Sequence, residues 1–212
     1  MIVTPEQLAA FTAAAMLITL SPGPDNLMVL SLGIAKGRRQ GMAFGLGCAL
    51  GCLTHTVLAA IGVSALIAAS PLAFGLLKIA GGAYLVYLGW HAIRSRGSRL
   101  QAADGAADGT PLAAHFRKGL LANAINPKVV LFFLAFLPQF VNPAQGHSGW
   151  QIAILGLIFT AQAALLFGSL GYFAGAIGSW LNRTPKASQW LDRIAGGVFI
   201  ALGLRLMLAP TH

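Results

Sequence analysis

Two short proline-containing segments place charged and amide side chains inside otherwise apolar stretches of the sequence. The first, Ser21-Pro22-Gly23-Pro24-Asp25-Asn26, lies within an apolar run from Leu8 to Leu32. The second is Asn126-Pro127-Lys128, and Asn123 precedes it. A carboxylate, an ammonium group and neutral amides in a confined space can together bind both charges of a small zwitterion, such as an amino acid. These residues form the predicted ligand site.

Both segments are expected to interrupt a helix, because proline has no backbone N–H and its ring clashes with the carbonyl four residues earlier. Backbone groups left unpaired in lipid cost several kcal/mol each, so such a break is tolerated only where protein packs against it or where it lines a wet cavity. A structural kink that neighbouring helices satisfy is the alternative. It gives no reason for Asp25, whose charge costs roughly 2.5 to 3.5 kcal/mol at the membrane centre.

The composition predicts an integral membrane protein built from α-helices. Hydrophobic residues make up 57% of the chain and charged residues 9%, whereas soluble domains carry about 25% charged residues. The net charge of +9 does not indicate nucleic acid as a partner, because no basic patch is long enough or interleaved with aromatic residues. Glu6 and the lack of Lys or Arg before the first apolar run argue against a cleaved secretory signal.

Six apolar stretches are long enough to cross a hydrocarbon core about 30 Å thick. We place them at about 4–32, 42–69, 72–93, 119–141, 150–176 and 190–208. Of the 14 basic residues, 11 lie in alternate loops or at their edges, namely Lys36, Arg38, Arg39, Arg94, Arg96, Arg99, Arg117, Lys118, Arg183, Lys186 and Arg193. The positive-inside rule makes that side cytoplasmic and places both termini outside.

The two halves of the chain resemble each other. The sequence KIAGGAY at 78–84 corresponds to RIAGGVF at 193–199, and the first proline break corresponds to the second. Because each half has an odd number of spans, the halves must cross the membrane in opposite senses, as in many secondary transporters. We therefore expect two inverted three-span repeats at 1–96 and 117–212, joined by a cytoplasmic linker at 97–116.

The two breaks lie at a similar depth. Asp25 is 11 residues from Lys36, and Lys128 is 10 residues from Lys118, which is roughly 15 Å at the helical rise per residue and about half the membrane thickness. The half-helices that begin after each break would present free N–H groups at the positive end of a helix dipole. We expect Asp25 to hold an ammonium group or a proton, and Lys128 and the helix ends to hold a carboxylate.

Several other polar residues inside the spans have two interpretations. His55 could relay protons or pack between helices, and Gln162 has the same ambiguity. Cys48 and Cys52 could indicate thiol–disulfide chemistry or, more simply, close helix packing. Lys128 could instead be a paired or snorkelling cation. No metal-binding cluster, catalytic triad or phosphate loop occurs in the sequence, so we expect no enzyme activity and no cofactor.

The motifs in combination resemble the lysine exporter (LysE/RhtB) family over nearly the whole chain. The resemblance rests on the motif at 21–25, the glycine-rich second span, Gly-Ala-Tyr-Leu-Val-Tyr-Leu-Gly-Trp at 82–90, and Asn-Pro-Lys followed by Phe-Phe-Leu-Ala-Phe-Leu-Pro-Gln-Phe at 132–140. It implies an exporter of amino acids or close derivatives in the bacterial inner membrane, coupled to protons. It leaves open which amino acid is moved and whether the protein is a homodimer. The alternatives are a passive channel for a small solute and a thiol–disulfide electron carrier that uses the two cysteines.

Overall fold

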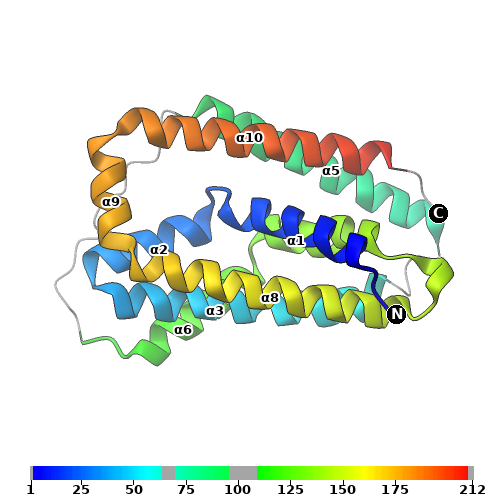
Figure 1. The fold of residues 1–212 in the computed structure, drawn as a ribbon, viewed down its shortest axis with the longest axis horizontal. Coiled ribbons are helices and arrows are strands. Elements are labelled where there is room, and N and C mark those ends of the chain that lie inside the picture. Colours follow the sequence, from blue (N-terminus) through cyan, green and yellow to red (C-terminus); the bar gives the residue numbers. More distant parts are fainter. Residues whose placement is uncertain (1, 64–69, 96–108, 210–212) are drawn as a thin grey trace.

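The computed structural model describes residues 2–63, 70–95 and 109–209, which form helices and no strands. The long helices run side by side along one axis of the molecule (Figure 1). The all-helical prediction is therefore confirmed for these residues.

The first apolar stretch is two helices, α1 (Pro5–Leu20) and α2 (Pro24–Ala35), so the predicted first break is confirmed. A capping box starts α1: the Thr4 side chain accepts a hydrogen bond from the Gln7 backbone, and the Gln7 side chain accepts one from the Thr4 backbone. α3 (Arg38–Leu58) follows and continues as the short π-helix η1 (Ala59–Val63).

The fourth apolar stretch is also broken, as predicted. α6 (Leu112–Ala124) and the segment Pro127–Phe140 are bent by 51° relative to each other. Beyond the bend the chain forms α7 (Pro127–Leu131), the π-helix η2 (Phe132–Phe136) and the 3-10 helix η3 (Leu137–Phe140). α6 begins at Leu112 rather than at 119, so its first turn lies in the segment that we assigned to the linker. Residues 97–108 of that linker lie outside the described residues.

Three other long helices complete the fold: α5 (Pro71–Arg94), α8 (Ser148–Tyr172) and α10 (Pro185–Leu208). The 3-10 turn η4 (Pro143–Gln145) precedes α8. The expected fifth span, 150–176, stops at Tyr172 because the chain turns into a separate helix, α9 (Ala174–Arg183). α10 corresponds to the predicted sixth span, 190–208, but it begins earlier, at Pro185. Proline can occupy the first turn of a helix, where no backbone N–H is needed.

Glycine residues set the closest helix contacts. A Cβ atom at Gly47 would lie 2.0 Å from the backbone oxygen of Phe116, and one at Gly119 would lie 2.0 Å from that of Phe44. α3 and α6 can therefore approach this closely only because both positions lack a side chain.

α5 and α10 pack against each other as an antiparallel pair. Gly82 lies against the backbone oxygen of Gly203, and Gly89 lies against that of Gly196. Because the residue numbers rise along α5 from 82 to 89 while those of the contacted residues on α10 fall from 203 to 196, the two helices run in opposite directions. Near one end of the pair, the buried ammonium group of Lys78 donates to the carbonyl of Ala209.

By length and apolar composition, three described helices could cross a membrane: Arg38–Gly62, Leu72–Arg94 and Ser148–Tyr172. The bent pair from Leu112 to Phe140 could be a fourth, whereas Pro5–Leu20 is apolar but shorter. α2, α5 and α9 end, and α3, α6 and α10 begin, at one end of the molecule, which is on the left in Figure 1. We call this the basic end, because basic residues flank these helix termini. α1 begins and α10 ends at the other end.

Candidate functional site

Lys128 replaces the hydrogen-bond donor that the first proline break removes. In a continuous helix the carbonyl of Ile18 would accept from the backbone N–H of residue 22, but Pro22 has none. The Nζ atom of Lys128 donates to this carbonyl at 3.2 Å and to the carbonyl of Ser21 at 3.1 Å. The buried ammonium group also lies at the C-terminal end of α1, where the helix dipole favours a cation. An ammonium group has a third donor, which these two bonds leave available.

Side chains from α2 and α8 meet at the same end of α1. Asn26 donates from Nδ2 to the carbonyl of Thr19 at 2.8 Å, and Gln162 donates from Nε2 to the Thr19 hydroxyl at 2.9 Å. The other amide atoms, Oδ1 of Asn26 and Oε1 of Gln162, are buried and have no hydrogen-bond partner within the described part of the chain. Leaving a buried acceptor unpaired costs about 1 to 3 kcal/mol, so both atoms are available to a ligand or a water molecule.

The buried Asp25 carboxylate is connected to α6 and α3 through Asn123. Asp25 is 3% exposed and accepts a hydrogen bond from Nδ2 of Asn123 at 3.1 Å. Nε2 of His55 lies 3.1 Å from the backbone carbonyl of Asn123. Because a carbonyl only accepts, Nε2 must carry the proton in this contact. The structure thus places His55 near Asp25 but gives it no direct contact with that carboxylate.

Asp25 and Lys128 line one small internal cavity of about 20 Å³, together with Asn123 and Cys52. The two charged residues of the predicted site are therefore brought to one cavity, although the hydrogen bonds of the Lys128 ammonium group go to carbonyls. A cavity of this size holds about one water molecule. It must expand before it can hold an amino acid.

The second helix start differs from the first. α7 has only five residues, and its N-cap Asn126 accepts the backbone N–H of Lys128 through Oδ1. α2 begins at Pro24 after Gly23, and no side chain caps it. The expectation that both half-helices present free N–H groups is therefore wrong for the second break, where the Asn126 side chain takes one of them. The Nδ2 atom of Asn126 is buried, and none of the residues that the structure describes forms a hydrogen bond with it.

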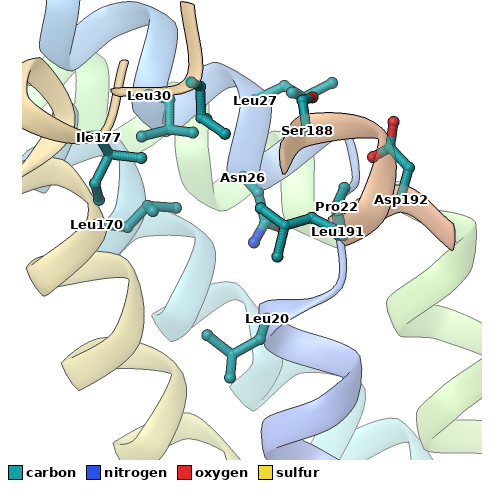
Figure 2. Close-up of a pocket in the computed structure, with 11 residues that line it drawn as sticks. Leu20, Pro22, Asn26, Leu27, Leu30, Leu170, Ile177, Ser188, Leu191 and Asp192 are labelled. Atoms are coloured by element: carbon teal, nitrogen blue, oxygen red, sulfur yellow. The ribbon is translucent and has the colours of Figure 1, made fainter. Parts of the chain in front are cut away.

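A larger cavity opens toward the basic end, and sequence reasoning did not identify it. It has a volume of about 130 Å³ and reaches from Pro22 and Asn26 to α10 (Figure 2). In Figure 2, Ser188, Leu191 and Asp192 lie on the α10 ribbon, and Asn26 and Pro22 line the same cavity. A neighbouring cavity of about 340 Å³ lies along Pro22, Gly23 and Pro24. The signal in the sequence was Asp192, a second carboxylate in an apolar stretch, which we overlooked beside Arg193.

Aromatic rings close the opposite side of the small cavity. Phe132 and Phe159 line it, with their ring centroids 5.1 Å apart. Phe133 packs against Phe159 at 5.0 Å, and Phe11 packs against Phe132 at 6.1 Å. The small cavity is thus separated from the end of the molecule where α1 begins by a layer of packed rings.

Both cysteines are buried and carry free thiols. The single S–H of Cys52 can donate either to the Asn123 side-chain oxygen at 3.5 Å or to the carbonyl of Cys48, one helical turn away, at 3.6 Å. These contacts fit packing residues, and they place Cys52 on the wall of the small cavity.

Comparison with known proteins places the chain among membrane translocators. The profile of the LysE type translocator family matches residues 16–209. The chain is 31% identical to the homoserine/homoserine lactone efflux protein of Salmonella typhimurium, over 94% of this chain and 95% of that protein. It is 29% identical to the leucine efflux protein of Enterobacter sp. (strain 638), over 92% of each, and 34% identical to an uncharacterized membrane protein of Vibrio cholerae, over 94% of this chain and 96% of that one. No solved structure matches the chain significantly.

Proposed function

The chain belongs to the LysE type translocator family, and from this membership we propose that it exports an amino acid or a close derivative across the bacterial inner membrane, coupled to protons. The observation that carries the proposal is that the two proline breaks bring one buried carboxylate, Asp25, and one buried ammonium group, Lys128, to the same cavity. Leucine and homoserine are the first substrates to test, because similar proteins are named for their efflux.

The unpaired atoms around the breaks match the two ends of an amino acid. The ammonium group of a ligand only donates, and the acceptors available to it are Asp25, Oδ1 of Asn26 and Oε1 of Gln162. A carboxylate only accepts, and the donors available to it are the third N–H of Lys128 and Nδ2 of Asn126. A bound zwitterion would therefore form hydrogen bonds with buried donors and acceptors whose unpaired state otherwise costs free energy.

The placement of the cavities supports an alternating-access mechanism. The spaces beside Pro22 open toward the basic end, which the positive-inside rule makes cytoplasmic, and the aromatic layer closes the other side. In this mechanism the substrate enters from the cytoplasm, the small cavity expands around it, and the aromatic layer then opens. A passive channel would need an open path past rings whose centroids are about 5 Å apart, as in Phe132–Phe159 and Phe133–Phe159.

We also propose that the fold is two inverted three-span repeats that meet at the breaks. The antiparallel packing of α5 and α10, with Gly82 against Gly203, supports this arrangement because these helices are the third spans of the two halves. In the same way α3 and α8, the second spans, pack along each other.

Proton coupling would act through Asp25, because one carboxylate can hold either a proton or the substrate ammonium group at a time. The test is efflux of leucine and homoserine from loaded proteoliposomes with and without an imposed pH gradient. We expect the gradient to accelerate efflux by wild-type protein and to have no effect on the Asp25→Asn variant, which keeps the amide contact with Asn123. Coupling at this residue would be contradicted if the efflux rate of wild-type protein did not depend on the pH gradient, or if that of Asp25→Asn still did.

A further inference from the structure

A second buried carboxylate lies where the two cavities of the basic end meet. Asp192 on α10 lines both the cavity of about 130 Å³ and the cavity of about 340 Å³, and it is 4% exposed. The two cavities also share Pro22 and Leu27, so Asp192 faces the start of the first proline break. Figure 2 shows Asp192 on α10, one turn beyond Ser188.

This carboxylate has unused hydrogen-bonding capacity. Its Oδ2 atom is buried and has no hydrogen-bond partner among the described residues. A side-chain hydrogen bond joins the carboxyl group to Ser95 at the end of α5. Two arginines on the same helices lie over tryptophan rings, Arg193 over Trp190 at 5.8 Å and Arg94 over Trp90 at 4.2 Å. No cation of the described residues forms an ion pair with Asp192, and a buried carboxylate without such a partner is costly unless a ligand or water completes it.

The cavity of about 340 Å³ also offers donors. Gly23 and Pro24 line it, and they begin α2, whose first turn has no side-chain cap. An uncapped helix start directs backbone N–H groups and a partial positive charge toward a carboxylate. The space between Asp192 and this helix start therefore presents an acceptor for an ammonium group and donors for a carboxylate.

We propose that Asp192 is the entry site for the substrate: it binds the ammonium group of an amino acid arriving from the basic end, before the substrate reaches Asp25. This assignment rests on the proposed export function. In this assignment the substrate binds first at Asp192 and then at Asp25. Pro22 marks the boundary between the two positions, because it lines both basic-end cavities beside the break. Asp192 thereby selects against molecules that have a carboxylate but no cationic group.

The test compares leucine with 2-hydroxyisocaproate, which has the same carbon skeleton and a hydroxyl in place of the ammonium group. Right-side-out membrane vesicles are loaded internally with either compound, and the apparent KM of efflux is measured for wild type and Asp192→Asn. The asparagine keeps the size of the side chain and can still bond to Ser95. We expect the KM for leucine to rise about tenfold, as for loss of one hydrogen bond to a charged group, and the KM for the hydroxy acid to change less than twofold.

Two further variants separate recognition from structure. Asp192→Glu keeps the charge and should restore most of the preference for leucine. Arg193→Gln removes a charge from the neighbouring exposed position and should leave that preference unchanged. An Asp192→Asn protein that moves leucine with wild-type KM, or that loses both compounds equally, would overturn the assignment while export stands. Wild-type protein that moves none of the standard amino acids would overturn the export function, and the assignment with it.

Discussion

Replacing Lys128 by methionine tests whether the ammonium group holds the broken helix together. Methionine has a similar length but no donor, so the carbonyls of Ile18 and Ser21 lose bonds of 3.2 and 3.1 Å. Each buried acceptor left unpaired costs about 1 to 3 kcal/mol. The variant also no longer has the desolvation penalty of a buried lysine charge, which offsets part of this loss. We therefore expect a net destabilisation of about 2 to 4 kcal/mol.

The buried cysteines supply the assay. A thiol-reactive dye reaches Cys48 and Cys52 only when the protein unfolds, because both are buried, so dye fluorescence during heating in detergent reports the midpoint temperature. At about 2 to 4 °C per kcal/mol for a chain of this size, Lys128→Met should lower the midpoint by roughly 4 to 16 °C. Lys118→Met, at an exposed position in α6, is the matched control and should shift it by less than about 2 °C. Equal midpoints for the two variants would refute the role of Lys128 at the helix break.

Two glycine substitutions, with a third as a control, test other contacts of the site and the fold. Gly23→Ala should slow leucine efflux severalfold, because the added Cβ would lie 2.8 Å from the Lys128 ammonium group. The loss of stability should be small, because the extended backbone at Gly23 accepts any residue. Efflux at the wild-type rate would show that the Lys128 side chain moves out of the way of this Cβ. Gly119→Ala should lower the midpoint temperature in the dye assay, because its Cβ would lie 2.0 Å from the Phe44 carbonyl, whereas Gly168→Ala, with nothing within 4 Å, should raise it slightly. A Gly119 variant as stable as the Gly168 variant would contradict the close packing of α3 and α6.

The positions of the two breaks could be predicted from the sequence because their cause is local. A proline removes its own N–H wherever the chain folds, so Pro22 and Pro127 fixed where α1 and α6 must end. Helix ends without such a signal were predicted less well. Nothing in the sequence around Phe173 requires a break, yet the chain bends there between α8 and α9.

The partners of the polar groups depended on the tertiary structure. The residue types alone placed a carboxylate, an ammonium group and amides near the breaks, but they did not indicate that Lys128 would bond to the carbonyls of α1 or that Asn123 would lie between Asp25 and His55. These bonds join residues about 70 to 110 positions apart in the chain. The packing of the glycine-lined helices decides which polar groups, far apart in the sequence, come within hydrogen-bond distance. The sequence therefore determined which groups must find partners, and only the packing of the helices decided which partners they have and which of them, such as Asp192, have capacity left for a ligand.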